Sequence, residues 1–549
     1  KTITHAANTV PAGAPGVPNT INVAAGLYSG SETFDIDFLN PYVELIGAGS
    51  STTVIDGGGA PVVLNIQATG IRVQDFTIQN AGTAIFANEG GFTIVDNIFS
   101  GSGAFDIIGG MYVLMEENIS TNRTIEDMQI ENNRFFVSED GVLIDIEINQ
   151  SDTSSNIDIG SIVFRDNVYT CQPGTVPTGS QEGIYIQDLD VEGINGAVAS
   201  VGTVTIENNR FYNGEHAIIF EGDIQDMEDA VVDTGAIRII NNTLINQSWA
   251  CCICVDPYNC ENWDGTTTAT VGDVIITDNT VTALGSEWGI DVYNIGYAHD
   301  LYNTSNATIG DTYIQRNNVN VGKLGIAVGY GDQWDLYNDS QVTVGDLYVD
   351  SGTIVAGGYG VGVALEVAKY QYDASSVRIG DIFIQDNFID SGSSSVALYY
   401  DDVGYEMHDD TSAELGEVHL ENNTINSGSD CFFFYYEDVA NSNGGNSNFV
   451  MGDTFIWSNT GTAVDDGIQI YYEGFEVGSH HSDDTYNELP RYDIQGNTFD
   501  VDGDGVNFYT HRSLYDNQNN AETTMGGFLI NDNTFGCDYG VYLFYDRIW

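Results

Sequence analysis

The sequence predicts an all-β fold, a single-stranded right-handed parallel β-helix of about 12 to 14 coils with roughly 36 residues in each. Three observations predict it: a corner motif recurs at a regular step, apolar residues alternate between corners, and no segment keeps a 3.6-residue period. Because each coil of such a solenoid packs only on its neighbours, one chain of 549 residues can form it.

The corner motif is usually an Asp-Asn or Asn-Asn pair followed by a β-branched or aromatic residue. Its second residue falls at Asn97, Asn133, Asn167, Asn209, Asn242, Asn279, Asn318, Asn387, Asn423, Asn459, Asn497 and Asn533, with Gly352 filling the one gap. The steps run from 33 to 42 residues. We expect these amides to stack at about 4.8 Å, to bond the turn backbone and one another, and to form a structural ladder and not a binding row.

Each coil is expected to hold strands between fixed corners. An apolar-Gly-Asp corner, as at 271–273, precedes three or four largely apolar residues and the asparagine corner. A second strand follows eight to ten residues later, as at 289–293 and 467–471. Acidic excursions such as 297–300 and 406–410 come next, so we expect one side of the solenoid to be acidic and decorated with Tyr.

Aromatic residues recur at matching places, as at 398–400, 432–436 and 544–545. Ladders in the core or on a sheet face explain them most simply. A platform on which sugars stack stays open as the alternative if one row is exposed.

The opening residues carry a resemblance. Segments 20–28 (Thr-Ile-Asn-Val-Ala-Ala-Gly-Leu-Tyr), 43–49 and 53–59 resemble the first coil of the pectate-lyase-like right-handed β-helix superfamily, which includes NosD-type repeats and archaeal cell-surface or sheath proteins. The resemblance implies an N-terminal cap and first coils over 1–60 and β-helix repeats over 61–549. It implies no single chemistry, because the superfamily contains lyases, hydrolases, adhesins and envelope proteins.

The charge excludes whole classes of partner. Eighty acidic residues stand against 14 Lys and Arg residues, which gives a formal net charge of −66. Coulomb repulsion therefore excludes nucleic acid and anionic membrane surfaces. Hydrophobic residues still make up 42% of the chain, enough to bury a continuous core.

Location follows from what the sequence does and does not contain. No run of about 18 apolar residues occurs, so we expect no membrane insertion. The sequence starts at Lys1, and a processed, secreted product at the cell surface is the simplest account. Nine Asn-x-Ser/Thr sequons are candidate glycosylation sites, namely Asn118, Asn122, Asn149, Asn241, Asn246, Asn303, Asn306, Asn338 and Asn422.

The seven cysteines are candidates for disulfides: Cys171, Cys251, Cys252, Cys254, Cys260, Cys431 and Cys537. A zinc site is the rival for the cluster at 251–260, but no histidine lies near it in the sequence, so disulfides are favoured. Cys171 and Cys537 share a corner about ten coils apart, so an intramolecular bond between them is not expected and a bond between subunits is a hypothesis.

One motif has the chemistry of a calcium site. Asp500, Asp502 and Asp504 alternate and end in Gly505, as in loops that wrap Ca²⁺, although the Glu expected at the twelfth position is His511. The segment 480–484 (His-His-Ser-Asp-Asp) offers ligands for a transition metal, and a solvated loop explains it as well.

Enzymatic signatures are missing. The superfamily's lyases, by the resemblance, use an Arg or Lys base with Ca²⁺, yet no basic pair recurs on neighbouring coils. Its polygalacturonase-like hydrolases use Gly-His-Gly and Arg-Ile-Lys blocks, which are absent. Asp465-Asp466, Arg491 and Arg512 remain as scattered candidates.

These observations favour a structural subunit of an extracellular layer, sheath, tube or filament that polymerises with itself, without a cofactor except Ca²⁺ and with surface glycans as a second partner. The segment 540–549, rich in aromatics and without a capping helix, is expected to leave an open edge. The alternatives are a polysaccharide lyase or hydrolase, and a carbohydrate-binding adhesin on the same scaffold.

Overall fold

The computed structural model describes residues 2–100, 109–119, 121–150, 155–171, 181–248, 251–441, 443–473, 485–511 and 522–546. The chain is an all-β parallel β-solenoid with roughly 36 residues in each turn, which confirms the predicted fold class. Two compact units are described separately: unit 1 contains Lys1–Asp223 and Asp233–Cys254, and unit 2 contains Ile224–Val232 and Val255–Trp549.

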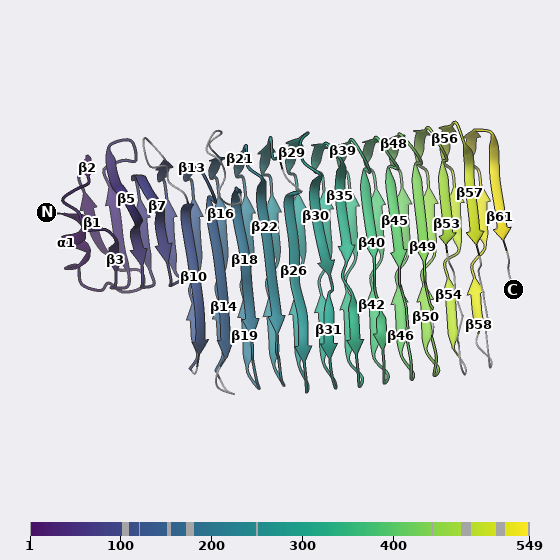
Figure 1. The fold of residues 1–549 in the computed structure, drawn as a ribbon, viewed down its shortest axis with the longest axis horizontal. Helices are drawn as coiled ribbons and strands as arrows, with labels where there is room; N and C mark the ends of the chain where they lie inside the picture. The colour runs from purple at the N-terminus through teal and green to yellow at the C-terminus, as the bar shows by residue number, and fades with distance from the viewer. Residues whose placement is uncertain are drawn as a thin grey trace. The chain divides into compact units, whose positions relative to one another are not determined.

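The strands of unit 1 stack from turn to turn in three sheets, and the strands within each sheet are parallel (Figure 1). Sheet 1, which precedes the asparagine corner, contains β1 (Asn19–Val23), β4 (Val43–Gly47), β6 (Ile71–Gln74), β8 (Phe92–Val95), β12 (Met128–Glu131), β16 (Ile162–Arg165), β20 (Val204–Glu207) and β24 (Ile237–Ile240). Sheet 2, which follows it, includes β5 (Thr53–Ile66), β7 (Thr77–Ala87), β10 (Gly109–Ile119), β14 (Val142–Gln150) and β18 (Glu182–Glu192). β22 (His216–Gln225) and β26 (Cys251–Trp263) begin in unit 1. Sheet 3 includes β11 (Arg123–Ile125), β15 (Ile157–Ile159) and β19 (Val198–Val201).

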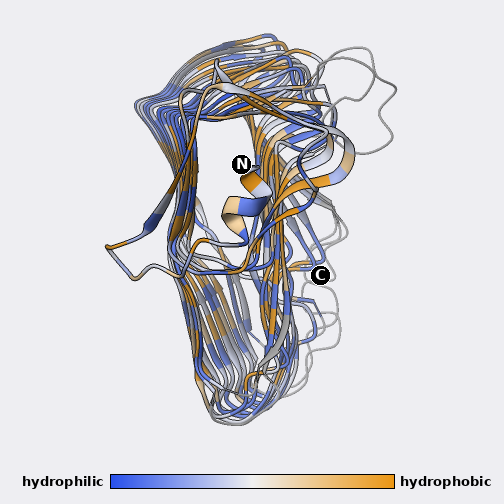
Figure 2. Ribbon diagram, turned by 90° about the vertical axis from the view of Figure 1, so that its left-hand side faces the viewer, coloured by the Kyte–Doolittle hydropathy of each residue, from blue (hydrophilic) through white to orange (hydrophobic). Residues whose placement is uncertain are grey.

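The helix of the described chain is α1 (Ile3–Ala7), whose first turn is capped by the Thr2 hydroxyl accepting the N–H of His5. Viewed along the stack, α1 lies across the interior of the first turns of unit 1 (Figure 2), and its residues Ile3 and Ala7 are buried. No helix in the described part of the chain is long and apolar enough to span a membrane.

Unit 2 contains strands of the same three sheets. Its sheet 1 contains β28 (Val274–Thr277), β33 (Thr312–Gln315), β38 (Leu347–Asp350), β43 (Ile382–Gln385), β47 (Val418–Glu421), β51 (Thr454–Trp457), β55 (Tyr492–Gln495) and β59 (Phe528–Asn531). Its sheet 3 contains β27 (Thr268–Val271), β32 (Asn306–Ile309), β37 (Gln341–Val344), β42 (Ser376–Ile379), β46 (Ser412–Leu415), β50 (Asn448–Met451), β54 (Tyr486–Leu489) and β58 (Glu522–Met525).

Sheet 2 of unit 2 places two or three strands in each turn. They include β31 (Ala298–Leu301), β34 (Asn318–Val321), β36 (Gln333–Leu336), β41 (Lys369–Gln371), β44 (Phe388–Ser391), β45 (Val396–Asp401), β49 (Phe432–Glu437), β56 (Thr498–Val501) and β57 (Asp504–His511). Side chains alternate between core and surface, so Phe432, Phe434 and Tyr436 are buried while the residues between them are half-buried. The excursion expected at 297–300 is partly a strand, because β31 begins at Ala298.

The asparagine ladder is confirmed. The Asn387 backbone N–H donates to Asn423 Oδ1 at 3.1 Å, and that of Asn423 donates to Asn459 Oδ1 at 2.8 Å. The Asn423 amide also donates to Ile384 O at 2.8 Å, so the side chain bonds the backbone of the preceding turn at two points. Gly352 fills its gap by donating its N–H to Asn387 Oδ1 at 2.9 Å.

One member of the ladder was predicted wrongly. Asn317 and not Asn318 occupies the buried position, and its Oδ1 accepts the Asn279 N–H at 2.9 Å. Arg316 takes the left-handed conformation (φ 52°) that Asp or Asn takes in most other turns, and Asn318 begins β34 with an exposed side chain. The Asn-Asn pair is thus shifted by one residue.

Candidate functional site

The predicted calcium ligands lie at one corner of unit 2. Asp500 is an outward residue of β56, Asp502 lies in the turn, and Asp504 begins β57 with a raised pKa, caused mainly by burial and by Asp466. The N–H of Asp504 donates to Asp466 Oδ1 at 2.7 Å. Calcium binding by this corner stays a prediction.

In the carboxylate pair at 465–466, Asp466 accepts a hydrogen bond from the backbone of the next turn. Asp466 is 8% exposed, its Oδ2 accepts the amide of Asn507 at 2.8 Å, and its own N–H donates to Asp430 Oδ1 at 3.1 Å. Asp430, Asp466 and Asp504 therefore form a second ladder, which gives Asp466 a structural role. Arg491 pairs with Asp453 at 2.7 Å on the surface, and Arg512 and 480–484 lie outside the described residues.

Cys251 and Cys254 form a disulfide, with their Cα atoms 5.8 Å apart. The other five cysteines are thiols. Cys171 is buried, and burial together with Asp140, Glu182 and Glu215 raises its pKa to about 12, so it is poorly placed for a bond between subunits. Cys537 is partly exposed, and its thiol donates to Tyr539 O at 3.1 Å.

The expectation that no histidine lies near the cysteine cluster is wrong in space. His216, at the start of β22, donates from Nδ1 to Cys251 O at 2.8 Å, and the same nitrogen lies 3.6 Å from Cys251 Sγ and 3.5 Å from Cys254 Sγ. The signal was available, because Cys251 follows His216 by 35 residues, about one turn. Burial lowers the pKa of His216.

An acidic patch covers the outer face of β10, β14 and β18 in unit 1. Glu116 lies opposite Glu147, which lies opposite Asp190, and Asp145 lies opposite Asp188 across a bulge after Ile144. No motif predicted this patch, because its members come from turns of different length.

Three carboxyl groups of the acidic patch have raised pKa values. Burial, followed by repulsion from Asp223 and Asp188, raises the pKa of Asp190 to about 8. Burial and neighbouring carboxylates likewise raise the pKa values of Asp145 and Asp188. Next to the patch, a groove of about 210 Å³ is lined by Thr83, Met111, Tyr112 and Glu139, among others. Such clustering is typical of functional sites.

Aromatic rings in unit 2 form stacks that run from turn to turn. On the outer face of sheet 1, Tyr313, Tyr348, Phe383, His419 and Phe455 follow one another with centroids 4.7–5.0 Å apart and planes within 19° of parallel. Rings this close cover each other's faces, so no pyranose ring fits between them and only their edges meet solvent. A sugar platform along this row is therefore ruled out.

Beside that row runs a line of carboxylates, which we call the corner row: Asp273, Asp311, Asp346, Asp381 and Glu417. One oxygen of each of the first four accepts a backbone N–H of the next turn, at 3.0, 2.9, 2.8 and 2.7 Å. A groove of about 480 Å³ follows the row at Asp346, Asp381 and Glu417. Ligand atoms of Asp381, Glu417 and His419 lie within 4.8 Å of one another.

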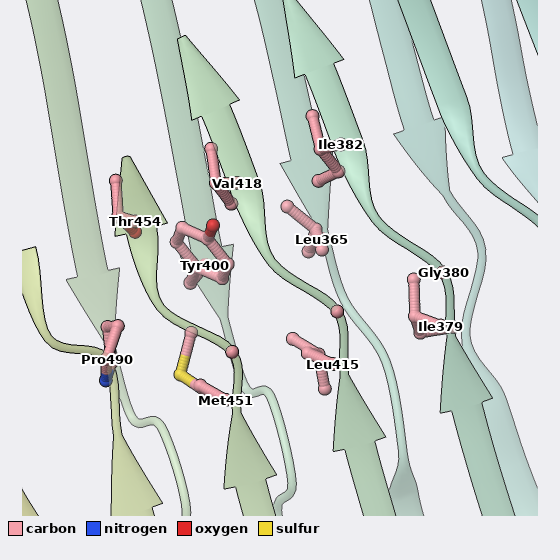
Figure 3. A pocket seen from close by; sticks show the side chains of 12 residues that line it. Leu365, Ile379, Gly380, Ile382, Tyr400, Leu415, Val418, Met451, Thr454 and Pro490 are labelled. Atoms are coloured by element: carbon pink, nitrogen blue, oxygen red, sulfur yellow. The ribbon is translucent and has the colours of Figure 1, made fainter. Parts of the chain in front are cut away.

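A small cavity lies in the core of unit 2 (Figure 3). It measures about 10 Å³ and is lined mainly by apolar side chains such as Leu365, Ile382, Leu415 and Met451, with the Tyr400 hydroxyl as a polar group. That volume holds about one water molecule and no sugar.

The sequons are mostly accessible. Six asparagines are exposed, namely Asn122, Asn241, Asn246, Asn303, Asn338 and Asn422, and two are half-buried, Asn149 and Asn306. The side chain of Asn118 lies outside the described part. Glycosylation itself stays a prediction.

No protein-family model matches the chain, and no curated protein matches it. Among solved structures the chain is similar to the A-module of a mannuronan C-5 epimerase of Azotobacter vinelandii, at 13% identity over 95% of this chain and 91% of that one, with a TM-score of 0.19. A likeness of that size carries no argument about chemistry. The chain is therefore assigned by its own architecture, as a parallel β-solenoid whose surface chemistry must be argued from its residues.

Proposed function

We propose that the protein is a structural subunit of an extracellular assembly, such as a surface layer, sheath, tube or filament, that forms by self-association of acidic β-helices. The corner row carries the proposal. It places a carboxylate at the same point of successive turns, at the strand spacing of about 4.8 Å.

A periodic line of like charges repels an identical line on another copy. Divalent cations shared between two such lines remove that repulsion, and oxygen ligands of this kind suit Ca²⁺. The ring stacks support the same role, because rings that cover each other's faces stiffen the turns and leave no platform for a ligand.

Sedimentation velocity and negative-stain microscopy of the purified protein test this function. Addition of Ca²⁺ should produce ordered assemblies that a chelator dissolves, and Na⁺ at equal ionic strength should not. The double variant Asp381→Asn/Glu417→Gln should need several-fold more Ca²⁺. Its control, Asp339→Asn/Asp373→Asn, removes two exposed turn carboxylates one turn apart and should assemble as the parent does. A protein that stays monomeric in all these conditions would contradict the proposal.

The acidic patch of unit 1 favours a second candidate, a polysaccharide-active enzyme. Asp190, protonated near neutral pH, is suited to act as a general acid, and ionised carboxylates nearby as a base. A panel of neutral and uronate polysaccharides tests it by product release. Cleavage that is lost in Asp190→Asn and kept in Asp278→Asn would establish the enzyme and displace the structural role.

A further inference from the structure

The disulfide and its histidine form a compact group in unit 1. Cys251 and Cys254 are 5% and 3% exposed, and the Nδ1 atom of His216 lies beside the disulfide, 3.6 and 3.5 Å from their sulfurs. The three possible ligand atoms lie within 4.8 Å of one another.

These distances match the edges of a tetrahedral metal site. With Zn–S bonds of about 2.3 Å and Zn–N bonds of about 2.05 Å, tetrahedral angles give an S···N edge of about 3.6 Å. The two sulfurs on one zinc ion would lie about 3.8 Å apart, so they must move about 1.7 Å further apart than in a disulfide to complete the triangle of ligands.

The disulfide adds little to the stability of the fold. It closes a loop with two intervening residues, Cys252 and Ile253, and so removes little entropy from the unfolded chain. The Cys-x-x-Cys spacing is shared by zinc sites and by redox-active pairs. Neither reading alone accounts for a histidine placed against both sulfurs.

We propose that Cys251, Cys254 and His216 form a redox-controlled site for a thiophilic divalent metal ion, closed as the disulfide and opened by reduction. A dithiol supplies two electrons and two protons: the Sγ–Sγ bond breaks, both cysteines become thiols, and the reductant becomes a disulfide. A Zn²⁺ ion then displaces the two thiol protons and forms two Zn–S bonds.

His216 supplies the third ligand. Its Nδ1 proton, which Cys251 O accepts in the closed form, passes through solvent to Nε2, and the freed lone pair binds the metal. Burial favours the neutral imidazole that this step requires. Three protein ligands leave a fourth position for water, and metal binding releases two protons overall.

Cobalt spectroscopy tests the site. The whole protein is reduced with a phosphine, freed of reductant without air, and titrated with Co²⁺ and then with Zn²⁺. We expect one equivalent of Co²⁺ to give thiolate-to-cobalt charge-transfer absorption with tetrahedral ligand-field bands, and Zn²⁺ to abolish both. The oxidised protein should give neither signal.

Variants assign the ligands. His216→Ala should weaken Co²⁺ binding at least tenfold, and His216→Cys should restore it with stronger charge-transfer absorption. Cys537→Ser and His299→Ala should titrate as the parent does. Circular dichroism checks that each variant is folded. Absence of the cobalt signal in protein shown to contain seven thiols, or equal affinity in the parent and His216→Ala, would overturn the proposal.

Discussion

Unit 1 and unit 2 differ in the regularity of their turns. Successive ladder asparagines in unit 1 are separated by 34, 42 and 33 residues from Asn133 to Asn242, whereas those of unit 2 are separated by 36, 36, 38 and 36 from Asn387 to Asn533. The longest strands of unit 1, such as β10 and β18, are longer than those that lie wholly in unit 2.

The difference teaches where chemistry can arise on a repeated scaffold. Equal positions in successive turns bring equal side chains together in both units, so amides bond amides and rings cover rings. In unit 1 unequal turns also bring carboxylates together on β10, β14 and β18, and a histidine against a disulfide. Buried Asp291 of unit 2 has its pKa raised to about 7 by burial alone, whereas Asp190 of unit 1 also has carboxylate neighbours.

The largest expected effect comes from breaking the ladder of unit 2. Asn423→Ala leaves the buried N–H of Asn387 and the carbonyl of Ile384 without their partner. At about 1 to 3 kcal/mol for each group, guanidinium unfolding should show a loss of about 2 to 6 kcal/mol. Asn426→Ala, at an exposed position of the same turn, should cost less than about 0.5 kcal/mol. Equal costs for the two variants would show that the ladder is not what holds the turns.

The next largest effect is a dependence of folding stability on pH that differs between the two units. The folded pKa of Asp190, about 8, exceeds the unfolded value of about 3.9. The stabilisation from its bound proton is fully present below about pH 4 and is lost as the pH rises through about 8. Asp190→Asn, which keeps an oxygen for the Asp223 N–H, should therefore exceed the parent in stability at pH 8 by on the order of 2 to 4 kcal/mol and match it at pH 4.

Asp278 of unit 2 should respond with the opposite sign. The guanidinium of Arg316 lowers the pKa of this carboxyl, so its stabilisation is present at neutral pH and is lost as the pH falls through the lowered folded value. Parallel pH slopes for Asp190→Asn and Asp278→Asn in chemical denaturation would contradict the assignment.

A smaller effect is expected from the ring stack. Phe383→Ala removes a ring that contacts Tyr348 and His419 on both faces, and thermal unfolding should show a loss of about 1 to 2 kcal/mol. Phe388→Ala, at a residue 44% exposed on β44, is the matched control and should lose less than about 0.5 kcal/mol. A larger loss of stability in Phe388→Ala than in Phe383→Ala would show that the ring stack does not stabilise the fold.

The smallest loss of stability is expected when an arginine that pairs with surface carboxylates is replaced. Arg165 pairs with Glu131 and Glu207 on the two neighbouring turns of unit 1. Its side chain is 41% exposed, so Arg165→Gln should cost about 0.5 to 1 kcal/mol at low salt and nothing at 1 M salt. Arg378→Gln in unit 2, where one carboxylate lies 3.9 Å away, should cost less. A salt-independent loss would point to packing instead.

The fold was predictable because a repeat displays its corners in the sequence. The one-residue error at Asn317 arose because Arg316 takes a conformation usually left to Asp or Asn. The acidic patch was not predictable, because a bulge and unequal turns decide which of 80 acidic residues meet. His216 could have been found by looking one turn, about 36 residues, before the cysteine cluster.

Electron microscopy of the protein taken from its native source tests the structural role most directly. The account predicts ordered layers, tubes or filaments in which β-helices repeat side by side, loosened by a calcium chelator. Isolated single particles, unchanged by chelator and active on a polysaccharide, would contradict it.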